Sequence, residues 1–300
     1  GYGCVDTETE ILTINGWKHH DQVIEGDIVL TLNHETGFSE WQPVLFMNRY
    51  QVEEEDMLLL KAKGHSSLTT MNHKWPIVYS SSQKDKPDKR IWTTSEFIGE
   101  RNYGLIVGAV NVDLPITKKY SDDFVSLVAW YYTEGNVVSK AIEITQCERV
   151  NPENVKEIYS SLVSLFGEES EVIGGPGRRE SPKWRLSRRG KRVQLAKFRL
   201  NTAASESILE VAPNKIVSRE FIYSLTKDQL EIFLAVSIKA DGHRFGLIGQ
   251  KEKERTEAIK LAALLLGYRT SYTERSMCSK AYSTATEHQI SFTDQRIIKF

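Results

Sequence analysis

The chain has 300 residues, of which 40% are hydrophobic and 26% are charged, and its formal net charge is −1 at pH 7. This length exceeds the usual size of a single domain and predicts two domains, and the near-zero net charge gives no sign that the molecule as a whole binds a polyanion. The sequence lacks an apolar run of the roughly 18 residues that a membrane-spanning helix needs, which argues against a membrane partner.

Cysteine usage favours a reducing compartment. Cys4, Cys147 and Cys278 lie far apart and show no CxxC spacing, which argues against a disulfide framework and against a cysteine zinc site. The first residues, Gly1 to Cys4, lack the basic and apolar regions of a signal peptide. We therefore expect a cytoplasmic protein.

Residues 1–118 are predicted to form an all-β domain. Short apolar runs, such as 11–14 and 28–32, alternate with turn residues such as Asn15-Gly16, a pattern typical of short strands. After Pro115 the apolar spacing becomes helical, so we place a domain boundary near residue 118 and assign residues 119–300 to a second domain.

The second domain contains an internal duplication. One copy reads as a helix ending at Glu134-Gly135, a strand ending at Gln146 and a further helix. The other copy reads as a helix ending at Asp241-Gly242, a strand ending at Gln250 and a further helix. The two copies predict a pseudo-two-fold domain of the α/β (α+β) class. The repeats are assigned to residues 119–212 and 213–300.

The duplication places an acid at the C-terminal end of each repeat's first helix. If the two helices pack about the pseudo-two-fold axis, the carboxylates of Glu134 and Asp241 converge, and they repel each other because helix C-termini are already negative. A hard divalent cation such as Mg²⁺ relieves that repulsion and also binds phosphate oxygens. Either acid alone could simply end a surface helix. Together they predict a metal site for phosphodiester cleavage.

The segments 127–135 (LVAWYYTEG) and 234–242 (LAVSIKADG) resemble the two motifs of LAGLIDADG homing endonucleases. The resemblance implies a metal-dependent double-strand cut in DNA, with Glu134 and Asp241 as catalytic metal ligands. It also implies a sheet over the DNA major groove and a role near the active site for Lys215, although the proline that commonly follows this lysine in the family is absent. Gln146 and Gln250 would order water, touch DNA or merely end their strands.

A basic stretch follows in the first repeat. Residues 176–199 hold ten Lys and Arg against one acid, Glu180, and apolar residues interleave with the cations. This pattern predicts a hairpin whose cationic face neutralises phosphates and reads guanine edges, or else a solvated surface hairpin. The predicted DNA-binding residues of this stretch are Arg178, Arg179, Arg185, Arg188, Arg189, Lys191 and Arg192.

The N-terminal residues suggest a second chemistry. A thiol at Cys4 could attack the preceding carbonyl if a threonine and a histidine, here Thr70 and His73, polarised the Gly3–Cys4 amide. Taken singly, Cys4 could be a buried thiol and His73 a core histidine. Together they resemble the first blocks of inteins with the Hint fold. Further matches are Ile11-Leu12-Thr13, Gly26-Asp27-Ile28-Val29 and Trp92-Thr93-Thr94-Ser95-Glu96.

The intein resemblance implies that Cys4 starts protein splicing by an N–S acyl shift, with Thr70 and His73 as its activators. Host-protein segments would be partners in cis, with residues 1–3 as a remnant of one. The splicing blocks that close an intein have no counterpart in residues 297–300, so a separate C-terminal intein fragment is a further expected partner.

The sequence thus predicts an all-β Hint-like splicing domain followed by a LAGLIDADG endonuclease domain. We expect a monomer of prokaryotic or phage origin that binds double-stranded DNA. Two alternatives stay open. One is a non-cleaving nucleic-acid-binding protein, either a degenerate endonuclease or an RNA splicing cofactor. The other is a Hint autoprocessing protein whose second domain only binds DNA.

Overall fold

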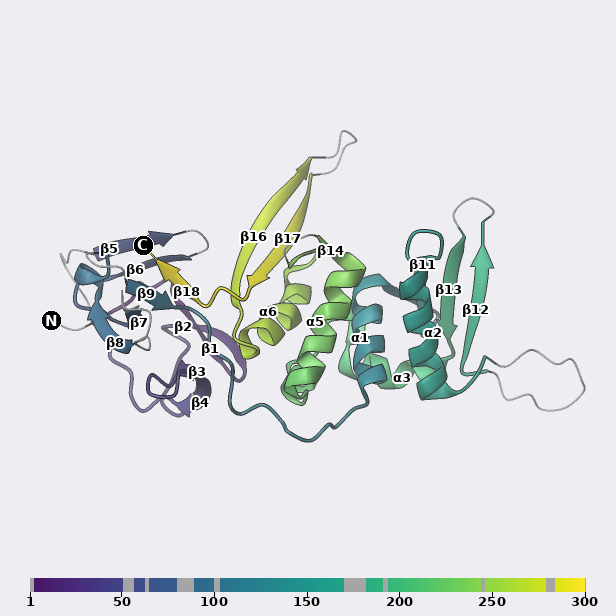
Figure 1. Ribbon diagram of the computed structural model, residues 1–300, viewed down its shortest axis with the longest axis horizontal. Coiled ribbons are helices and arrows are strands. Elements are labelled where there is room, and N and C mark those ends of the chain that lie inside the picture. Colours follow the sequence, from purple (N-terminus) through teal and green to yellow (C-terminus); the bar gives the residue numbers. More distant parts are fainter. Residues whose placement is uncertain are drawn as a thin grey trace, which may run out of the picture. The chain divides into compact units, whose positions relative to one another are not determined.

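The computed structural model combines helices with several antiparallel sheets (Figure 1) and divides into two compact units. Unit 1 comprises Gly1–Asp113, Leu264–Ser271 and Thr293–Phe300, and unit 2 comprises Leu114–Ala263 and Tyr272–Phe292. The structure describes residues 3–50, 57–62, 65–79, 89–99, 103–169, 182–190, 194–243, 246–278 and 284–299. Within those residues no helix is long and apolar enough to cross a membrane.

Unit 1 is built mainly from short antiparallel strands, as the sequence predicts. Two four-stranded sheets have the orders β2-β1-β3-β4 and β18-β9-β7-β8, and β5 pairs with β6. A core of Leu60, Ile77, Ile98 and Leu105 is buried in this unit. The strands are β1 (Glu10–Thr13), β2 (Gly16–His19), β3 (Ile28–Leu32), β4 (Ser39–Pro43), β5 (Met57–Ala62), β6 (His65–Thr70), β7 (Lys74–Tyr79), β8 (Lys89–Thr94), β9 (Tyr103–Ile106) and β18 (Ile297–Lys299), with a 3₁₀ turn η1 (Ser95–Phe97).

The domain boundary differs from the prediction in two respects. The chain leaves unit 1 after Asp113 rather than near residue 118, and the segments Leu264–Ser271 and Thr293–Phe300 belong to unit 1 instead of the second domain. Strand pairing accounts for the segment Thr293–Phe300. β18 runs antiparallel along β9 with Ile298 opposite Leu105, so it covers hydrogen-bonding groups that an edge strand would leave open.

Unit 2 repeats one arrangement twice. Each half contains a helix that runs into a hairpin, a second helix and a second hairpin, and the sheets have the corresponding orders β10-β11-β13-β12 and β14-β15-β17-β16. The predicted duplication is therefore present in the fold. The helices are α1 (Asp122–Glu134), α2 (Pro152–Phe166), α3 (Thr202–Val211), η2 (Pro213–Lys215), α4 (Arg219–Tyr223), α5 (Lys227–Asp241) and α6 (Lys253–Leu265). The strands are β10 (Gly135–Val138), β11 (Ala141–Cys147), β12 (Trp184–Arg189), β13 (Leu195–Leu200), β14 (Gly242–His243), β15 (Leu247–Gln250), β16 (Arg269–Cys278) and β17 (Thr284–Thr293).

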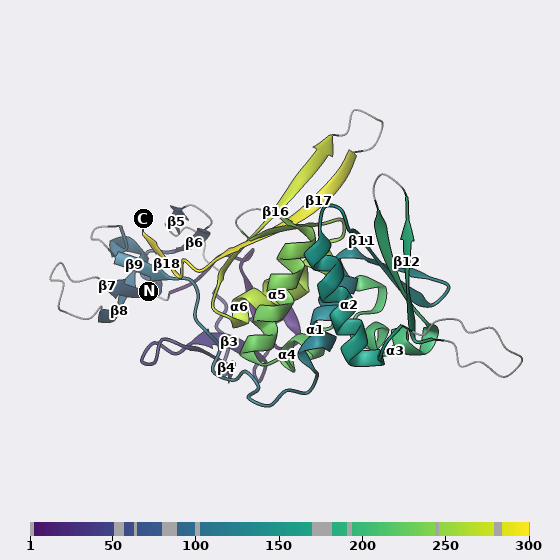
Figure 2. The same ribbon diagram turned by 45° about the vertical axis from the view of Figure 1, so that its right-hand side comes forward.

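The helices α1 and α5 lie side by side at the centre of unit 2, with the hairpins β12–β13 and β16–β17 on opposite sides of the pair (Figures 1 and 2). Both begin with side-chain caps. Ser121 Oγ accepts a hydrogen bond from the backbone of α1, and Thr226 forms a capping box at the start of α5. Tyr132 and Phe233 pack between the two helices with ring centroids 5.9 Å apart.

A glycine ends each of these helices because the backbone turns directly into a strand. A Cβ at Gly135 would overlap the backbone of Tyr131, and a Cβ at Gly242 would overlap the backbone of Ile238. The acid before each glycine is therefore the last residue of its helix, and the next residue begins β10 or β14. This junction fixes where the two carboxylates can lie.

Candidate functional sites

The two predicted acids share one site in unit 2. Glu134 is the last residue of α1 and Asp241 is the last residue of α5. Burial raises the pKa of Glu134, the neighbouring Gln146 opposes that rise, and the charge of Asp241 adds to it. The helices α1 and α5 pack against each other, and the charge of Asp241 acts on Glu134.

A glutamine from a strand end accompanies each acid. Gln250 Nε2 donates a hydrogen bond to Asp241 Oδ2 at 3.0 Å. Gln146 lies beside Glu134, and its Oε1 accepts a hydrogen bond from Asn151 Nδ2 at 3.3 Å. Both glutamines are buried. Because both side chains are buried, they are better placed to orient the acids than to contact a DNA base directly.

Lys215 reaches the same site from the turn η2. Its Nζ donates a hydrogen bond to the backbone oxygen of Thr133 at 2.7 Å, next to the end of α1. Its φ of +62° is left-handed, a conformation that a non-glycine residue holds only under constraint. Burial lowers the pKa of Lys215, the guanidinium of Arg255 lowers it further, and Asp241 and Glu134 oppose these effects. Lys215 thus lies where the charges of both acids act on it.

Arg255, in the first turns of α6, is a cation of this site that the sequence analysis missed. Its backbone oxygen accepts a hydrogen bond from the hydroxyl of Tyr132, which ties α6 to α1. Its Nη2 donates to Glu252 Oε1 at 3.2 Å, and its Nε is buried without a hydrogen-bond partner. The charge of Arg255 affects Lys215, as do the carboxylates of Asp241, Glu134 and Glu252.

The carboxylate pair suits a hard cation held partly by other ligands. Among the residues that the structure describes, no set of three or more His, Cys, Asp or Glu side chains is placed to hold a metal ion. Mg²⁺ in proteins is commonly bound by one or two carboxylates together with water and phosphate oxygens. Glu134 and Asp241 provide carboxylates of that kind, and a cation beside them would offset the burial and the charge of Asp241, which both raise the pKa of Glu134.

The first sheet of unit 2 has a covered face and an open face. Directly paired residues of antiparallel strands project from the same face, and successive residues project from opposite faces. The covered face contains Ile142, Ile144 and Phe198, which are fully buried. The open face of the first sheet contains Glu143, Arg185, Arg189, Lys197 and Arg199.

Glu143 holds two of the cations on this open face. Lys197 Nζ lies 2.9 Å from Glu143 Oε2, and Arg199 Nη1 lies 2.7 Å from Glu143 Oε1. The hydrogen bond from Lys197 is the main reason that the pKa of Glu143 is lowered. Arg185 and Arg189 are exposed on the same face. The described part of this face thus presents four cations against one carboxylate.

The predicted DNA-binding arginines do not all share this face. The hairpin forms as predicted, but Arg188 pairs with Ala196 and projects from the covered face with Leu186. Its guanidinium binds Glu148, with Nε 2.8 Å from Oε2 and Nη2 3.0 Å from Oε1. Adjacent strand residues alternate between faces, so Arg188 lies apart from Arg189. The predicted residues Arg178, Arg179, Lys191 and Arg192 lie outside the described residues.

In unit 1, Cys4 is held by the residue predicted to activate it. Cys4 N donates a hydrogen bond to Thr70 Oγ1 at 2.9 Å, and Thr70 N donates to Cys4 O at 3.0 Å. The Thr70 hydroxyl in turn donates to Asn72 Oδ1 at 2.9 Å. These bonds fix the Gly3–Cys4 amide next to β6.

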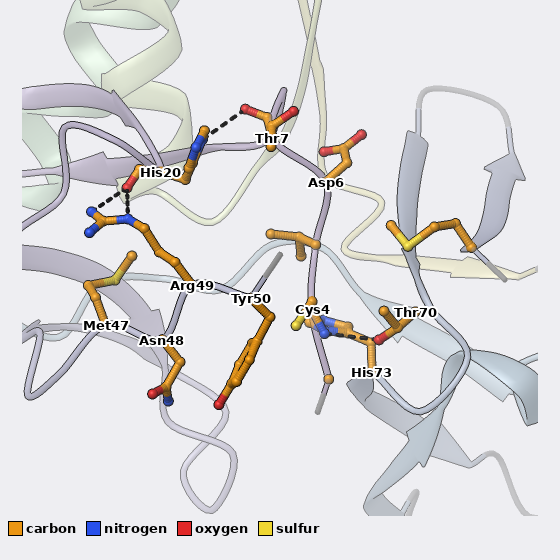
Figure 3. A pocket seen from close by; sticks show the side chains of 13 residues that line it. Cys4, Asp6, Thr7, His20, Met47, Asn48, Arg49, Tyr50, Thr70 and His73 are labelled. Atoms are coloured by element: carbon orange, nitrogen blue, oxygen red, sulfur yellow. Dashed lines mark hydrogen bonds between the residues drawn. The ribbon is translucent and has the colours of Figure 1, made fainter. Parts of the chain in front are cut away.

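His73 completes this cluster beside a pocket of about 610 Å³ (Figure 3). Burial lowers the pKa of His73, and the Gly3 backbone partly opposes that effect. Nδ1 of His73 is buried and has no hydrogen-bond partner within normal geometry. The opposite side of the pocket is formed by residues 47–50, including Arg49, whose guanidinium binds the backbone oxygen of His20 at 2.7 Å. The Gly3–Cys4 amide and His73 therefore line the same pocket.

Comparison with known proteins adds little evidence about function to the geometry of these sites. No protein-family model and no curated protein matches the chain. Among solved structures, one from a study of mesophilic variants of the homing endonuclease I-DmoI matches with a TM-score of 0.38 and 10% sequence identity, over 58% of this chain and 89% of that chain. A likeness of this size does not establish a shared activity, so the proposals below depend on the arrangement of side chains.

Proposed function

We propose that unit 2 is a LAGLIDADG-type endonuclease that makes metal-dependent double-strand cuts at a long DNA site. The observation that carries this proposal is the meeting of Glu134 and Asp241 at the ends of α1 and α5, with Gln250 bonded to Asp241 and Lys215 beside both acids. The cationic open face of the first sheet supports binding to a polyanion.

The residues divide into distinct roles. Glu134 and Asp241 would hold Mg²⁺, which when bound supplies charge to activate water and to stabilise the leaving oxygen. Gln250 orients the carboxylate of Asp241 through its hydrogen bond. Lys215 and Arg255 place positive charge where a phosphate that has entered the site would gain negative charge during cleavage. In this proposal each acid would serve the cleavage of one DNA strand, in keeping with the two-fold arrangement of unit 2.

The test is cleavage of a plasmid library with Mg²⁺ by the full chain and by Glu134→Gln and Asp241→Asn variants. Each variant should lose at least about a hundredfold in rate, while DNA affinity should stay within about tenfold, a difference of roughly 1.4 kcal/mol. Asp123→Asn is the matched control, because this acid lies at the opposite end of α1 and bonds Ser161 and Ser164. Strong cleavage by the double variant would refute the two-acid mechanism, and binding without any cleavage by the wild type would favour the non-cleaving alternative.

We also propose that unit 1 is the N-terminal part of an intein of the Hint type, with host segments in cis and a separate C-terminal fragment as partners. The specific observation in its favour is the hydrogen bond from Cys4 N to Thr70 Oγ1, with His73 beside the same peptide bond. In the proposed step, Cys4 Sγ attacks the Gly3 carbonyl carbon, the Gly3–Cys4 C–N bond breaks, and a thioester forms. The thiol of Cys4 loses its proton as Sγ attacks, and His73 would donate a proton to the amide nitrogen, so that the net shift moves one proton from sulfur to nitrogen.

This second activity is tested with a reporter fused before Gly3 and the C-terminal fragment added in trans. Dithiothreitol or hydroxylamine should release the reporter, because both attack a thioester far faster than an amide. His73→Ala should slow release by about 10²–10⁴-fold, the usual contribution of a general acid, and Cys4→Ala should abolish it. His20→Ala is the control, since His20 lines the same pocket but binds the Thr7 backbone. Release that persists in Cys4→Ala would rule out the acyl shift.

A further inference from the structure

The two sheets of unit 2 differ sharply in charge. The strands of the first sheet carry Arg185, Arg188, Arg189, Lys197 and Arg199. In the second sheet, β14, β15 and β17 contain neither lysine nor arginine, and β16 contains two arginines. Since phosphate contacts supply affinity without sequence information, the second sheet has little of the chemistry that binds DNA non-specifically.

The second sheet also has a covered face and an open face. Ile248 and Ile290 are paired, are each 1% exposed, and line one small cavity together with Ile259 of α6. The alternate residues project from the other face, where Gly249 lies directly opposite Gln289. Glu287, two residues before Gln289 on the same strand, shares that open face and is partly exposed.

Gln289 is held in a fixed orientation on this open face. Its Nε2 donates a hydrogen bond to Glu287 Oε2 at 2.7 Å. The Glu287 carboxylate lies over Gly249, and a Cβ at Gly249 would overlap it. The missing side chain of Gly249 thus makes room for the acid that orients Gln289. The carboxamide retains one N–H and its oxygen for another partner.

We propose that Gln289 is a specificity-determining residue that reads an adenine in the half-site contacted by the second repeat, an inference that rests on the proposed DNA endonuclease function. A carboxamide presents a donor and an acceptor side by side, which match N7 and N6 of adenine in the major groove. Glu287 uses one N–H and leaves this pair available, so the orientation is set before DNA binds. The first sheet anchors the backbone of the DNA, and the second sheet selects the sequence.

The experiment selects duplexes from a library with randomised positions by binding to the full chain, followed by sequencing. With the wild type, one adenine in the second half-site should be enriched. Gln289→Ala should reduce that enrichment roughly tenfold to a hundredfold, since a bidentate base contact contributes about 1–3 kcal/mol of discrimination. Preferences at the other positions should not change. Arg185→Gln, on the open face of the first sheet, should instead weaken binding to all sequences about equally.

Two further variants separate base reading from a structural role. Exchange of the pair, with Glu287→Gln and Gln289→Glu together, reverses the hydrogen bond between the two positions and places an acceptor at position 289. The preferred base should then change from adenine to cytosine, whose N4 is a donor. Gly249→Ala displaces only a carboxylate and should weaken the adenine preference without a loss of stability.

The outcomes distinguish the two proposals. If the wild type selects a long duplex and Gln289→Ala keeps every base preference, Gln289 does not read DNA, although the endonuclease proposal stands. If the exchanged pair still prefers adenine, the carboxamide contact is refuted. If the wild type selects no duplex at all, the proposed function fails and this inference fails with it.

Discussion

Replacement of Glu134 by glutamine should make the protein more stable while it removes cleavage. Glu134 is half-buried, and burial and Asp241 both raise its pKa above the usual 4.5. An acid whose folded pKa is raised destabilises the fold at any pH above that folded pKa. Glu134→Gln removes the ionised group and keeps its shape. Single substitutions that remove an unfavourable local interaction commonly raise the free energy of unfolding by about 0.5–2 kcal/mol.

The assay is thermal unfolding from pH 7 to pH 4. For a domain of 150–250 residues, about 1 kcal/mol shifts Tm by roughly 2–4 °C, so the variant should melt about 1–8 °C above the wild type at pH 7. The difference should fade as pH falls through the folded pKa of Glu134 towards 4.5, because the carboxyl group is then protonated. Mg²⁺ at ten times its Kd should raise the free energy of unfolding of the wild type by about 1.4 kcal/mol and that of the variant by less.

Glu143→Gln is a control with the opposite sign. Lys197 and Arg199 bind Glu143, and the pKa of Glu143 is lowered. This acid therefore stabilises the fold above pH 4.5 and loses that contribution as pH falls through its folded pKa. Glu143→Gln should lower the free energy of unfolding by about 1–3 kcal/mol at pH 7. If both variants melted below the wild type at pH 7, or if the gain for Glu134→Gln persisted at pH 4, the electrostatic account of the site would be refuted.

The remaining predictions concern the sheet faces. Arg185→Ala with Arg189→Ala should flatten the dependence of log K on log salt for DNA binding by about 0.9 for each phosphate that the protein no longer neutralises, whereas Arg188→Ala should leave that slope unchanged, since Arg188 binds Glu148 on the covered face. Equal effects in a fluorescence-anisotropy titration would contradict the assignment of faces. Ile298→Ala, at a buried position of β18, should destabilise unit 1 by about 2–5 kcal/mol in urea unfolding.

Much of the acid site could be predicted because the duplication repeats its signals. Two helix ends with an acid before a glycine, each followed by a strand that ends in glutamine, specify equivalent positions without any alignment. Arg255 was missed because it is the third residue of α6, and the third residue of α2 in the first repeat is the uncharged Asn154. A comparison that looked only for shared residue types could not find a cation present in one repeat alone.

The sheet face from which Arg188 projects could also have been predicted from the sequence. Trp184 and Leu186 alternate with arginines, so a strand that buries both must turn Arg188 to the same side and Arg189 to the other. A count of local charge ignores this alternation. The pairing of β18 with β9 was beyond such reasoning, because neither strand contains a local signal that specifies a partner so distant along the chain.

The pairing of β18 with β9 has a consequence for the order of folding. About 190 residues separate Ile106 from Ile297, and closing a flexible loop of that length costs about 5 kcal/mol of chain entropy. If unit 2 folds first, most of that loop is already compact, and the remaining closure is much less costly. The sheet that contains β9 should therefore be completed late, and variants that slow the folding of unit 2 should also delay the pairing of β18 with β9.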